Sequence, residues 1–148
     1  MKKQSLFTTG YEGENIHDFI LKLLTNKISV VIDIREIPLS RKKGFSKNAL
    51  KTILNENEIH YIHYKQLGSP KKIRHKLHED RDYESFFNEY RSYISGQLSV
   101  LDELKETINS GNACLLCFEK DHKTCHRSIV AEELNDKVYN NTLDIINI

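Results

Sequence analysis

The sequence predicts an α/β fold, with a single domain over residues 1–148 and a mainly parallel sheet of about five strands flanked by helices. Segments with strand and helix patterns alternate from one end of the chain to the other, as they do in parallel sheets covered by helices. The length of 148 residues suits one compact domain, and no internal repeat, low-complexity tract or linker divides the chain. These observations together predict one layered domain.

The first half of the chain alternates strands and helices with clear local signals. Asn15 is a suitable N-cap for a helix whose apolar residues recur at helical spacing, and Ser46 is a suitable N-cap for a second helix. The second strand is apolar and rich in β-branched residues, which is typical of a strand buried on both faces. The predicted elements are strands at residues 6–9, 28–34 and 59–64 and helices at residues 16–24 and 47–57.

The second half begins with a polar, basic segment over residues 65–82, which contains Gly68-Ser69-Pro70 and is predicted to be a long loop or lid. A long helical pattern follows, and we expect a break near Gly96 because glycine weakens a helix interior. The remaining predicted elements are this helical region at residues 83–109, a strand at residues 113–118, a helix from residue 125 or 126 to about residue 137, and a last strand at residues 143–148.

The composition limits the classes of protein to which the chain can belong. Its net charge is only +1, but basic residues concentrate in the first half, around residues 35–51 and 65–76. Such clusters suit either phosphate binding or an ordinary solvated surface. The sequence has no apolar run long enough to span a membrane and no secretory leader, which predicts an intracellular, cytoplasmic protein without membrane association. An odd number of cysteines in such a protein predicts free or metal-bound thiols.

All three cysteines lie close together, where the fourth predicted strand is followed by a helix. Cys114 and Cys117 are three positions apart, so they point to opposite faces of the strand, and Cys114 is predicted to be a core residue. Cys117 lies at the carboxyl end of the strand, facing the crevice where open α/β sheets bind ligands. Cys125 lies in the first turn of a helix, whose dipole is predicted to lower the pKa of its thiol.

Four roles remain open for Cys125 from the sequence. It could be a nucleophile, a redox partner for Cys117 or an inert buried thiol. It could also be a metal ligand, together with Cys117, His122 or His126.

Charged and aromatic side chains accompany the cysteines at the ends of the predicted strands. Arg127, in the first turn of a helix, is predicted to bind an anion together with free backbone amides. Glu119 is predicted first to form an ion pair with Arg127, with a general base or a metal ligand as alternatives. Asp33 and Arg35 are predicted either to line the same crevice or to form a solvent-side ion pair. The other candidates for the crevice are Tyr11, Glu12, Arg41, His63 and His126.

Four motifs carry a resemblance that covers nearly the whole chain. They are Thr9-Gly10-Tyr11-Glu12-Gly13, the segment from Asp33-Ile34-Arg35 to Gly44-Phe45-Ser46, Tyr61-Ile62-His63 with Leu67-Gly68, and Cys117-Phe118-Glu119 with Cys125-His126-Arg127. In sequence and spacing these motifs resemble the family called domain of unknown function 488. The resemblance implies an intracellular α/β protein with a catalytic or ligand site built from the motifs, and it brings no settled reaction.

We therefore expect an enzyme with a thiol- and arginine-containing site that acts on a phosphate-bearing substrate, such as a nucleotide or a nucleic acid. The arginines expected to bind the anion are Arg35, Arg41 and Arg127. The residues expected to carry out the chemistry are Cys117, Cys125, Glu119 and His63. The residues expected to complete the substrate site are Tyr11, Glu12, Asp33 and His126.

Two other hypotheses remain. The chain could be a nucleic-acid-binding module without catalysis, in which the basic first half contacts the phosphate backbone. Alternatively, Cys117, Cys125 and a histidine could form a small metal site, although their spacing matches no standard zinc pattern. We therefore expect no metal and no cofactor, and the sequence leaves the oligomeric state open.

Overall fold

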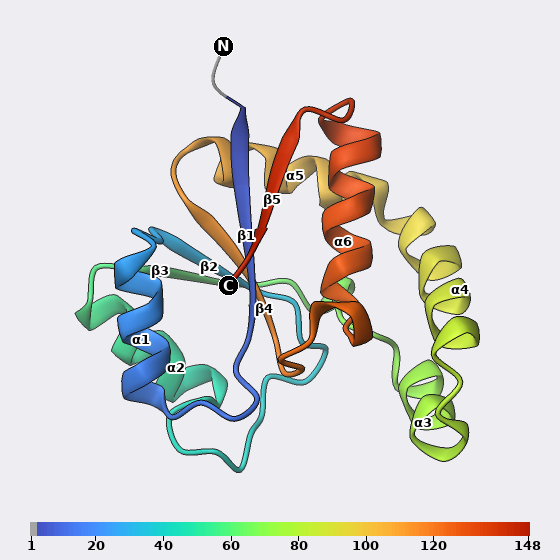
Figure 1. The fold of residues 1–148 in the computed structure, drawn as a ribbon, viewed down its shortest axis with the longest axis horizontal. Helices are drawn as coiled ribbons and strands as arrows, with labels where there is room; N and C mark the ends of the chain where they lie inside the picture. The colour runs from blue at the N-terminus through green and yellow to red at the C-terminus, as the bar shows by residue number, and fades with distance from the viewer. Residues whose placement is uncertain (1–2) are drawn as a thin grey trace.

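Figure 1 shows the computed structural model, which describes residues 3–148 as a five-stranded sheet with helices on both faces. The strand order is β3-β2-β4-β1-β5, and each neighbouring pair is parallel. The predicted α/β class, with a mainly parallel sheet of five strands, is therefore confirmed. The strands are β1 (Gln4–Gly10), β2 (Val30–Asp33), β3 (His60–His63), β4 (Ala113–Cys117) and β5 (Leu143–Asn147).

Two layers of helices cover the two faces of the sheet (Figure 1). Side chains alternate along each strand, so Leu116 on β4 packs with one layer while its neighbour Leu115 packs with the other. The first layer consists of α1 (Ile16–Thr25) and α2 (Lys47–Glu56). The second layer consists of α4 (Tyr83–Ile94), α5 (Leu98–Asn109) and α6 (Arg127–Glu133).

The chain connections explain where a ligand site can form. The chain runs from β1 through α1 to β2 and then through α2 to β3 on one face, and it returns through α4 and α5 to β4 on the other face. Because β4 lies between β1 and β2, the segments that follow these three strands leave the sheet in opposite directions. Such a switch point opens a crevice at the carboxyl edge of a parallel sheet.

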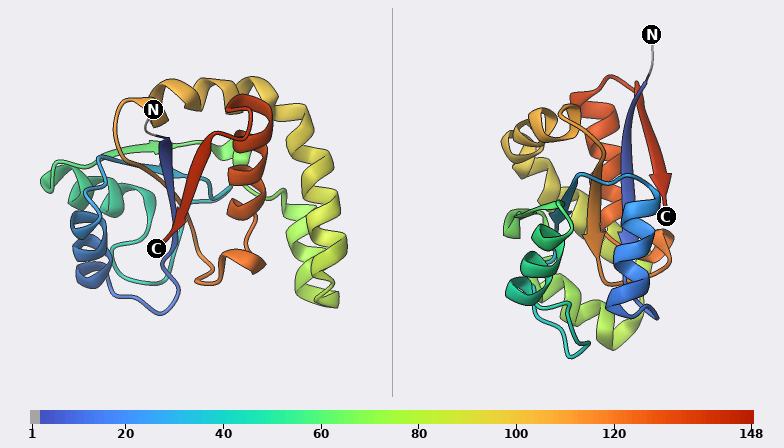
Figure 2. Two further views of the ribbon diagram at one scale, coloured as in Figure 1. Left: turned by 45° about the horizontal axis from the view of Figure 1, so that its top comes forward. Right: turned by 90° about the vertical axis from the view of Figure 1, so that its left-hand side faces the viewer.

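The segment predicted as a long loop or lid is the main departure from the sequence prediction. Residues 65–82 instead contain a short turn, η1 (Lys65–Leu67), and a ten-residue helix, α3 (Lys71–Asp80). Helix α3 lies beside α4 at the outside of its layer, as Figure 2 also shows, and none of its residues is buried. A helix that buries so few side chains has only a weak apolar pattern in its sequence, which is why it was predicted as a loop. Gly68-Ser69-Pro70 lies directly before its first residue.

The remaining elements follow the predicted order. The predicted break near Gly96 is confirmed, because η2 (Ser95–Gln97) separates α4 from α5. Helix α6 begins at Arg127 and continues as one wider turn, η4 (Leu134–Val138), which together match the extent of the predicted helix. Among the helices of the described residues 3–148, none combines the length and apolar character needed to cross a lipid bilayer.

Candidate functional site

A pocket of about 350 Å³ opens at the carboxyl edge of the sheet, where the chain leaves β1, β2 and β4. Its walls come from segments far apart in the sequence, including the start of α6 and the side of α3. The pocket therefore lies at the switch point of the sheet, where parallel α/β folds usually bind ligands. The predicted site residues that line it are Tyr11, Arg35, Cys117, Glu119 and His126.

Two glycines allow these segments to approach one another. A Cβ atom at Gly10, the last residue of β1, would overlap the carbonyl group of Glu119. A Cβ atom at Gly68 would overlap the backbone of Glu36 in the segment after β2. Both motifs therefore need glycine because backbone meets backbone there, and any side chain would push the pocket walls apart.

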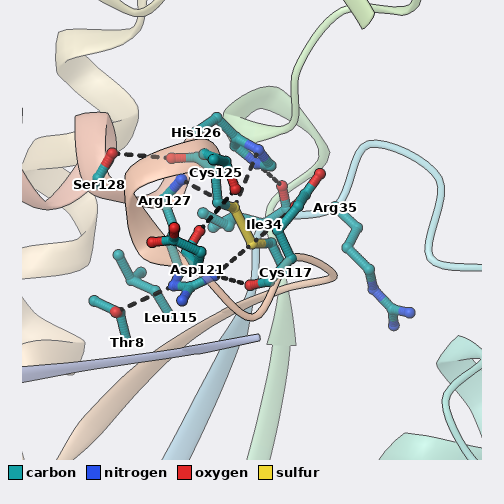
Figure 3. The surroundings of a disulfide bond; sticks show 12 residues. Thr8, Ile34, Arg35, Leu115, Cys117, Asp121, Cys125, His126, Arg127 and Ser128 are labelled. Carbon is teal, nitrogen blue, oxygen red and sulfur yellow. Dashed lines mark hydrogen bonds between the residues drawn. A yellow bond between two sulfur atoms is a disulfide. The ribbon is translucent and has the colours of Figure 1, made fainter. Parts of the chain in front are cut away.

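Cys117 lines this pocket and is joined to Cys125, which is not part of the lining. Cys117 ends β4, Cys125 lies just before α6, and a disulfide joins their sulfur atoms (Figure 3). The expectation of free or metal-bound thiols is therefore wrong for these two cysteines, because the turn after β4 folds the chain back on itself. Of the roles left open for Cys125, the structure records the pairing with Cys117.

Cys114 differs from the other two cysteines. It is fully buried in the layer of α1 and α2, on the face of β4 opposite Cys117, as the strand spacing predicted. It is a free thiol, and burial raises the pKa of Cys114 to about 12. Cys114 is therefore a core residue with an inert thiol.

Arg127 does not line the pocket in which it was predicted to bind an anion. Its side chain is 1% exposed and extends beneath the segment that follows β4. Nε donates to Thr8 Oγ1 over 3.2 Å, Nη2 donates to the Lys120 carbonyl over 3.0 Å, and Nη1 donates to the Glu119 carbonyl. Nη1 also lies 3.2 Å from Cys117 Sγ. Side chains at a helix start point back toward the N-terminus, which directs Arg127 under this segment.

Glu119 does not form the predicted ion pair with Arg127. The guanidinium of Arg127 instead donates a hydrogen bond to the backbone carbonyl of Glu119. The carboxylate turns toward the pocket, where Oε2 lies 3.5 Å from Cys117 Sγ. Burial raises the pKa of Glu119 above its ordinary value, although the charge of Arg127 opposes the shift. When the disulfide is reduced, this carboxyl group lies beside the Cys117 thiol, and its raised pKa suits it to exchange a proton with that thiol.

His126 lines the pocket as a neutral side chain. Nε2 lies 2.9 Å from the carbonyl oxygen of Ile34, which can only accept a hydrogen bond, so Nε2 carries the proton. Nδ1 is then an acceptor and lies 3.8 Å from Cys125 Sγ. Burial lowers the pKa of His126 to about 4, with the charge of Arg127 acting in the same direction and the Ile34 hydrogen bond against it. His126 therefore offers an unprotonated nitrogen to the sulfur pair at neutral pH.

Asp33 and Arg35 form a buried ion pair, and the alternative of a solvent-side pair is wrong. Arg35 Nε lies 2.9 Å from Asp33 Oδ1, and Arg35 Nη2 lies 2.8 Å from Asp33 Oδ2. Nη1 donates to the Tyr11 hydroxyl and to the Phe45 carbonyl, over 3.1 and 2.7 Å. Burial alone would lower the pKa of Arg35, but the hydrogen bonds and charge of Asp33 outweigh it and raise this pKa. Arg35 extends away from the disulfide (Figure 3).

Besides Cys125 and Arg127, four predicted site residues do not line the pocket. Arg41 is exposed on the surface, and Asp33 lies beneath Arg35. His63 Nε2 lies 2.7 Å from the Arg35 carbonyl, and Glu12 accepts a hydrogen bond from the backbone N–H of Lys120. The last two contacts fix the backbone of the pocket walls, so His63 and Glu12 are positioned to support the site from outside.

Arg74, the second arginine in the pocket lining, belongs to the basic cluster at residues 65–76 but was not among the predicted site residues. It comes from α3, the helix taken for a loop, and its Nη2 lies 3.2 Å from Glu36 Oε1. The available signal was the pair Ile73 and Leu77 at helical spacing within the basic segment. An apolar rim, also unpredicted, is formed by Ile37, Leu39 and Phe118, which are all exposed.

The fold and the site define a class: a parallel α/β protein with paired cysteines and a histidine at the carboxyl edge of its sheet. The model of the family described as domain of unknown function DUF488 matches residues 15–134. The chain therefore belongs to the DUF488 family, as the resemblance indicated, although the first of the four motifs, at residues 9–13, lies outside the matched residues. No curated protein and no solved structure matches the chain at a significant level.

Proposed function

We propose that the protein is a thiol-dependent enzyme acting on a small anionic substrate, with Cys117 as the reactive thiol and Cys125 as its redox partner. The position of Cys117 carries this proposal: it lines the pocket and touches both the Cys125 sulfur and the Arg127 guanidinium. A thiol at a pocket wall, next to a cation and a second thiol, has the surroundings of a reactive cysteine.

Each sulfur of the reduced pair has a proton acceptor of its own. The carboxylate of Glu119 lies 3.5 Å from Cys117 Sγ, and Nδ1 of His126 lies 3.8 Å from Cys125 Sγ. The N–H of Arg127, 3.2 Å from Cys117 Sγ, stabilises a thiolate at Cys117. A reducing cytoplasmic setting would keep the pair as thiols between turnovers.

The pocket suits a small molecule with one anionic group. A volume of about 350 Å³ lies at the lower end of the range for small-molecule sites. Arg35 and Arg74 line it and can donate hydrogen bonds to a phosphate or a carboxylate, whereas Arg41 and Arg127 lie elsewhere. The exposed ring of Phe118 at the rim can contact an apolar or aromatic portion of the same molecule.

The sulfur pair suits thiol–disulfide exchange with a small disulfide. The Cys117 thiolate attacks one substrate sulfur, a mixed disulfide forms, and the other half of the substrate leaves as a thiolate. The Cys125 thiolate then attacks Cys117 Sγ, which closes the Cys117–Cys125 bond and releases the second half. Two electrons pass from the protein thiols to the substrate, and the two thiol protons end on the two product thiols. A dithiol reductant restores the pair.

Limited alkylation with iodoacetamide tests the reactive thiol. On protein reduced and kept with a chelator at neutral pH, mass spectrometry should find Cys117 modified well before Cys114. Cys114→Ser should leave the labelling of Cys117 unchanged and serves as the matched control, while Cys117→Ser should abolish reduction of a small disulfide. Labelling of Cys117 no faster than that of the buried Cys114 would contradict the proposal.

One observation supports the rival function, nucleic-acid binding without catalysis. Helix α3 buries none of its residues and exposes three lysines: Lys71, Lys72 and Lys76. If this surface binds a phosphate backbone, affinity for single-stranded nucleic acid should fall steeply with added salt, and Lys71→Glu with Lys72→Glu should abolish binding. The alkylation of Cys117 should not change in this variant. Absence of binding at low salt would remove this rival.

A further inference from the structure

We infer that the reduced protein binds a borderline-soft metal ion, represented by Zn²⁺, between the Sγ atoms of Cys117 and Cys125 and Nδ1 of His126. One ligand atom from each residue lies within 4.8 Å of the other two, and all three residues are buried. Two thiolates and an imidazole are the donor set that Zn²⁺ prefers. This site uses the same two thiols as the proposed exchange reaction but does not depend on that reaction, and a bound ion would block it.

The orientation of His126 favours a metal ligand. Its Nε2–H donates to the Ile34 carbonyl over 2.9 Å, which leaves the Nδ1 lone pair facing Cys125 Sγ. Metal-binding histidines nearly always donate their other ring N–H to a carbonyl or carboxylate in this way, because that contact fixes the tautomer and the ring plane. The Ile34 carbonyl would therefore be the hydrogen-bond partner that orients His126 as a metal ligand.

The spacing of the backbone fits an atom between the two sulfurs. The Cα atoms of Cys117 and Cys125 lie 7.5 Å apart, farther than the roughly 4.4–6.8 Å usual for disulfides. Two sulfurs that share a metal ion stand farther apart than two bonded sulfurs, since each Zn–S bond is about 2.3 Å long. The segments that carry the two cysteines are thus set at a separation that a shared ion can bridge.

The charges around the site balance when the ion is present. Two thiolates neutralise a divalent cation, and the carboxylate of Glu119, although it forms no ion pair with Arg127, acts by its charge on that guanidinium. The N–H of Arg127 can donate to the metal-bound sulfur of Cys117. Cys117 and His126 line the pocket, so a small ligand in the pocket would be next to an ion held by these residues, as in zinc sites with three protein ligands and an open position.

Titration with Co²⁺ tests the site, because Co²⁺ occupies zinc sites and thiolate ligation gives an intense charge-transfer absorption. Protein reduced with a phosphine and stripped with a chelator should bind one Co²⁺ per chain with that absorption, and Zn²⁺ should displace it. Wild-type protein with the Cys117–Cys125 disulfide intact should bind none, since both sulfurs are then occupied. This comparison needs no mutation and so does not depend on a variant folding.

Variants locate the ligands. Loss of a residue that only orients a metal ligand typically weakens metal binding by roughly 10–100-fold. Cys125→Ser removes a ligand itself, so it should weaken Co²⁺ binding by at least this factor, while Cys114→Ser should bind Co²⁺ like wild type. Failure of reduced wild-type protein to bind Co²⁺, or equal binding by the oxidised protein, would overturn the inference. The alkylation test of the proposed function is run with a chelator, so an unreactive Cys117 in metal-free protein would defeat that proposal alone.

Discussion

The two buried arginines of this protein, Arg35 and Arg127, lie near the same pocket but are neutralised in different ways. Arg35 is paired through two hydrogen bonds with the carboxylate of Asp33. Arg127 makes no ion pair with a carboxylate among residues 3–148, and its donors go to carbonyl groups, to Thr8 and to the sulfur of Cys117. One guanidinium is therefore part of a fixed pair, and the other is held by dipoles and a sulfur.

This difference separates a fixed part of the site from one that depends on its redox state. Burying a cation costs several kcal/mol unless a negative charge accompanies it. Asp33 supplies that charge permanently, whereas Cys117 supplies it only as a thiolate and loses it in the disulfide. We infer that the surroundings of Arg35 keep the pocket wall in place in both redox states, while those of Arg127 favour the reduced state of Cys117.

The largest expected effect comes from breaking the fixed pair. Asp33→Asn leaves Arg35 buried without its carboxylate, so the free energy of unfolding should fall by about 3–5 kcal/mol, measured by urea denaturation. In the double variant Asp33→Asn with Arg35→Met, part of this loss should be recovered, because no buried charge remains. A double variant less stable than Asp33→Asn alone would show that the pair stabilises the fold by more than charge compensation.

In the oxidised protein a smaller effect is expected at the second arginine, and this effect depends on the redox state. Arg127→Met leaves the carbonyls of Glu119 and Lys120 without their donor and should cost about 2–3 kcal/mol in the oxidised protein. In reduced, chelator-treated protein the loss should be larger by about 1–3 kcal/mol, because the Cys117 thiolate also loses its partner. Urea denaturation with and without a phosphine reductant measures both values.

Arg35→Met is the matched control for this dependence on the reductant. Its cost should be the same in both redox states, because its partner Asp33 carries its charge in each. Equal costs of Arg127→Met in the two states would contradict the role of Cys117 as the negative partner of Arg127.

The sequence was sufficient to predict the sheet and several residues that line the pocket, and the reasons are local. Buried β-branched strands, helix caps such as Asn15 and the glycine break at Gly96 act within a few residues, and the structure has each of them. The position of Cys117, Glu119 and His126 beside a pocket followed from their place at the carboxyl end of a strand or the start of a helix.

What the sequence could not supply depends on contacts between distant segments. The sequence around Arg127 is compatible with a side chain that faces a ligand and with one that binds the segment after β4. Only the packing of that segment, whose Glu119 and Lys120 carbonyls accept from Arg127, decides between the two. Arg74 was named only as part of a basic cluster and not as a site residue, because α3 packs against α4 and carries little apolar pattern of its own. The pairing of Cys117 with Cys125 depends on the path of the turn between them, which no spacing rule gives.

The close approach of β1 to the segment after β4 offers a moderate test of the region around Arg127. Gly10→Ala places a Cβ atom against the Glu119 carbonyl that Arg127 holds, so the segment must shift. We expect a loss of about 1–3 kcal/mol in stability and slower alkylation of Cys117. Gly96→Ala is the control, because a Cβ atom there meets open space, so this variant should neither lower the stability nor slow the alkylation. Normal alkylation in Gly10→Ala would show that this contact does not set the geometry of the thiol.

The smallest effect is expected at Arg41, which the sequence placed beside Arg35 and Arg127 as a third anion-binding arginine. Its exposed side chain does not line the pocket, so Arg41→Ala should change the stability by less than about 0.5 kcal/mol and leave the alkylation of Cys117 unchanged. Arg74→Ala, which removes a pocket arginine, should instead weaken inhibition of that alkylation by phosphate or by a small carboxylate. If Arg41→Ala had the larger effect on inhibition, anion binding would belong to the exposed surface and the pocket arginines would serve the fold alone.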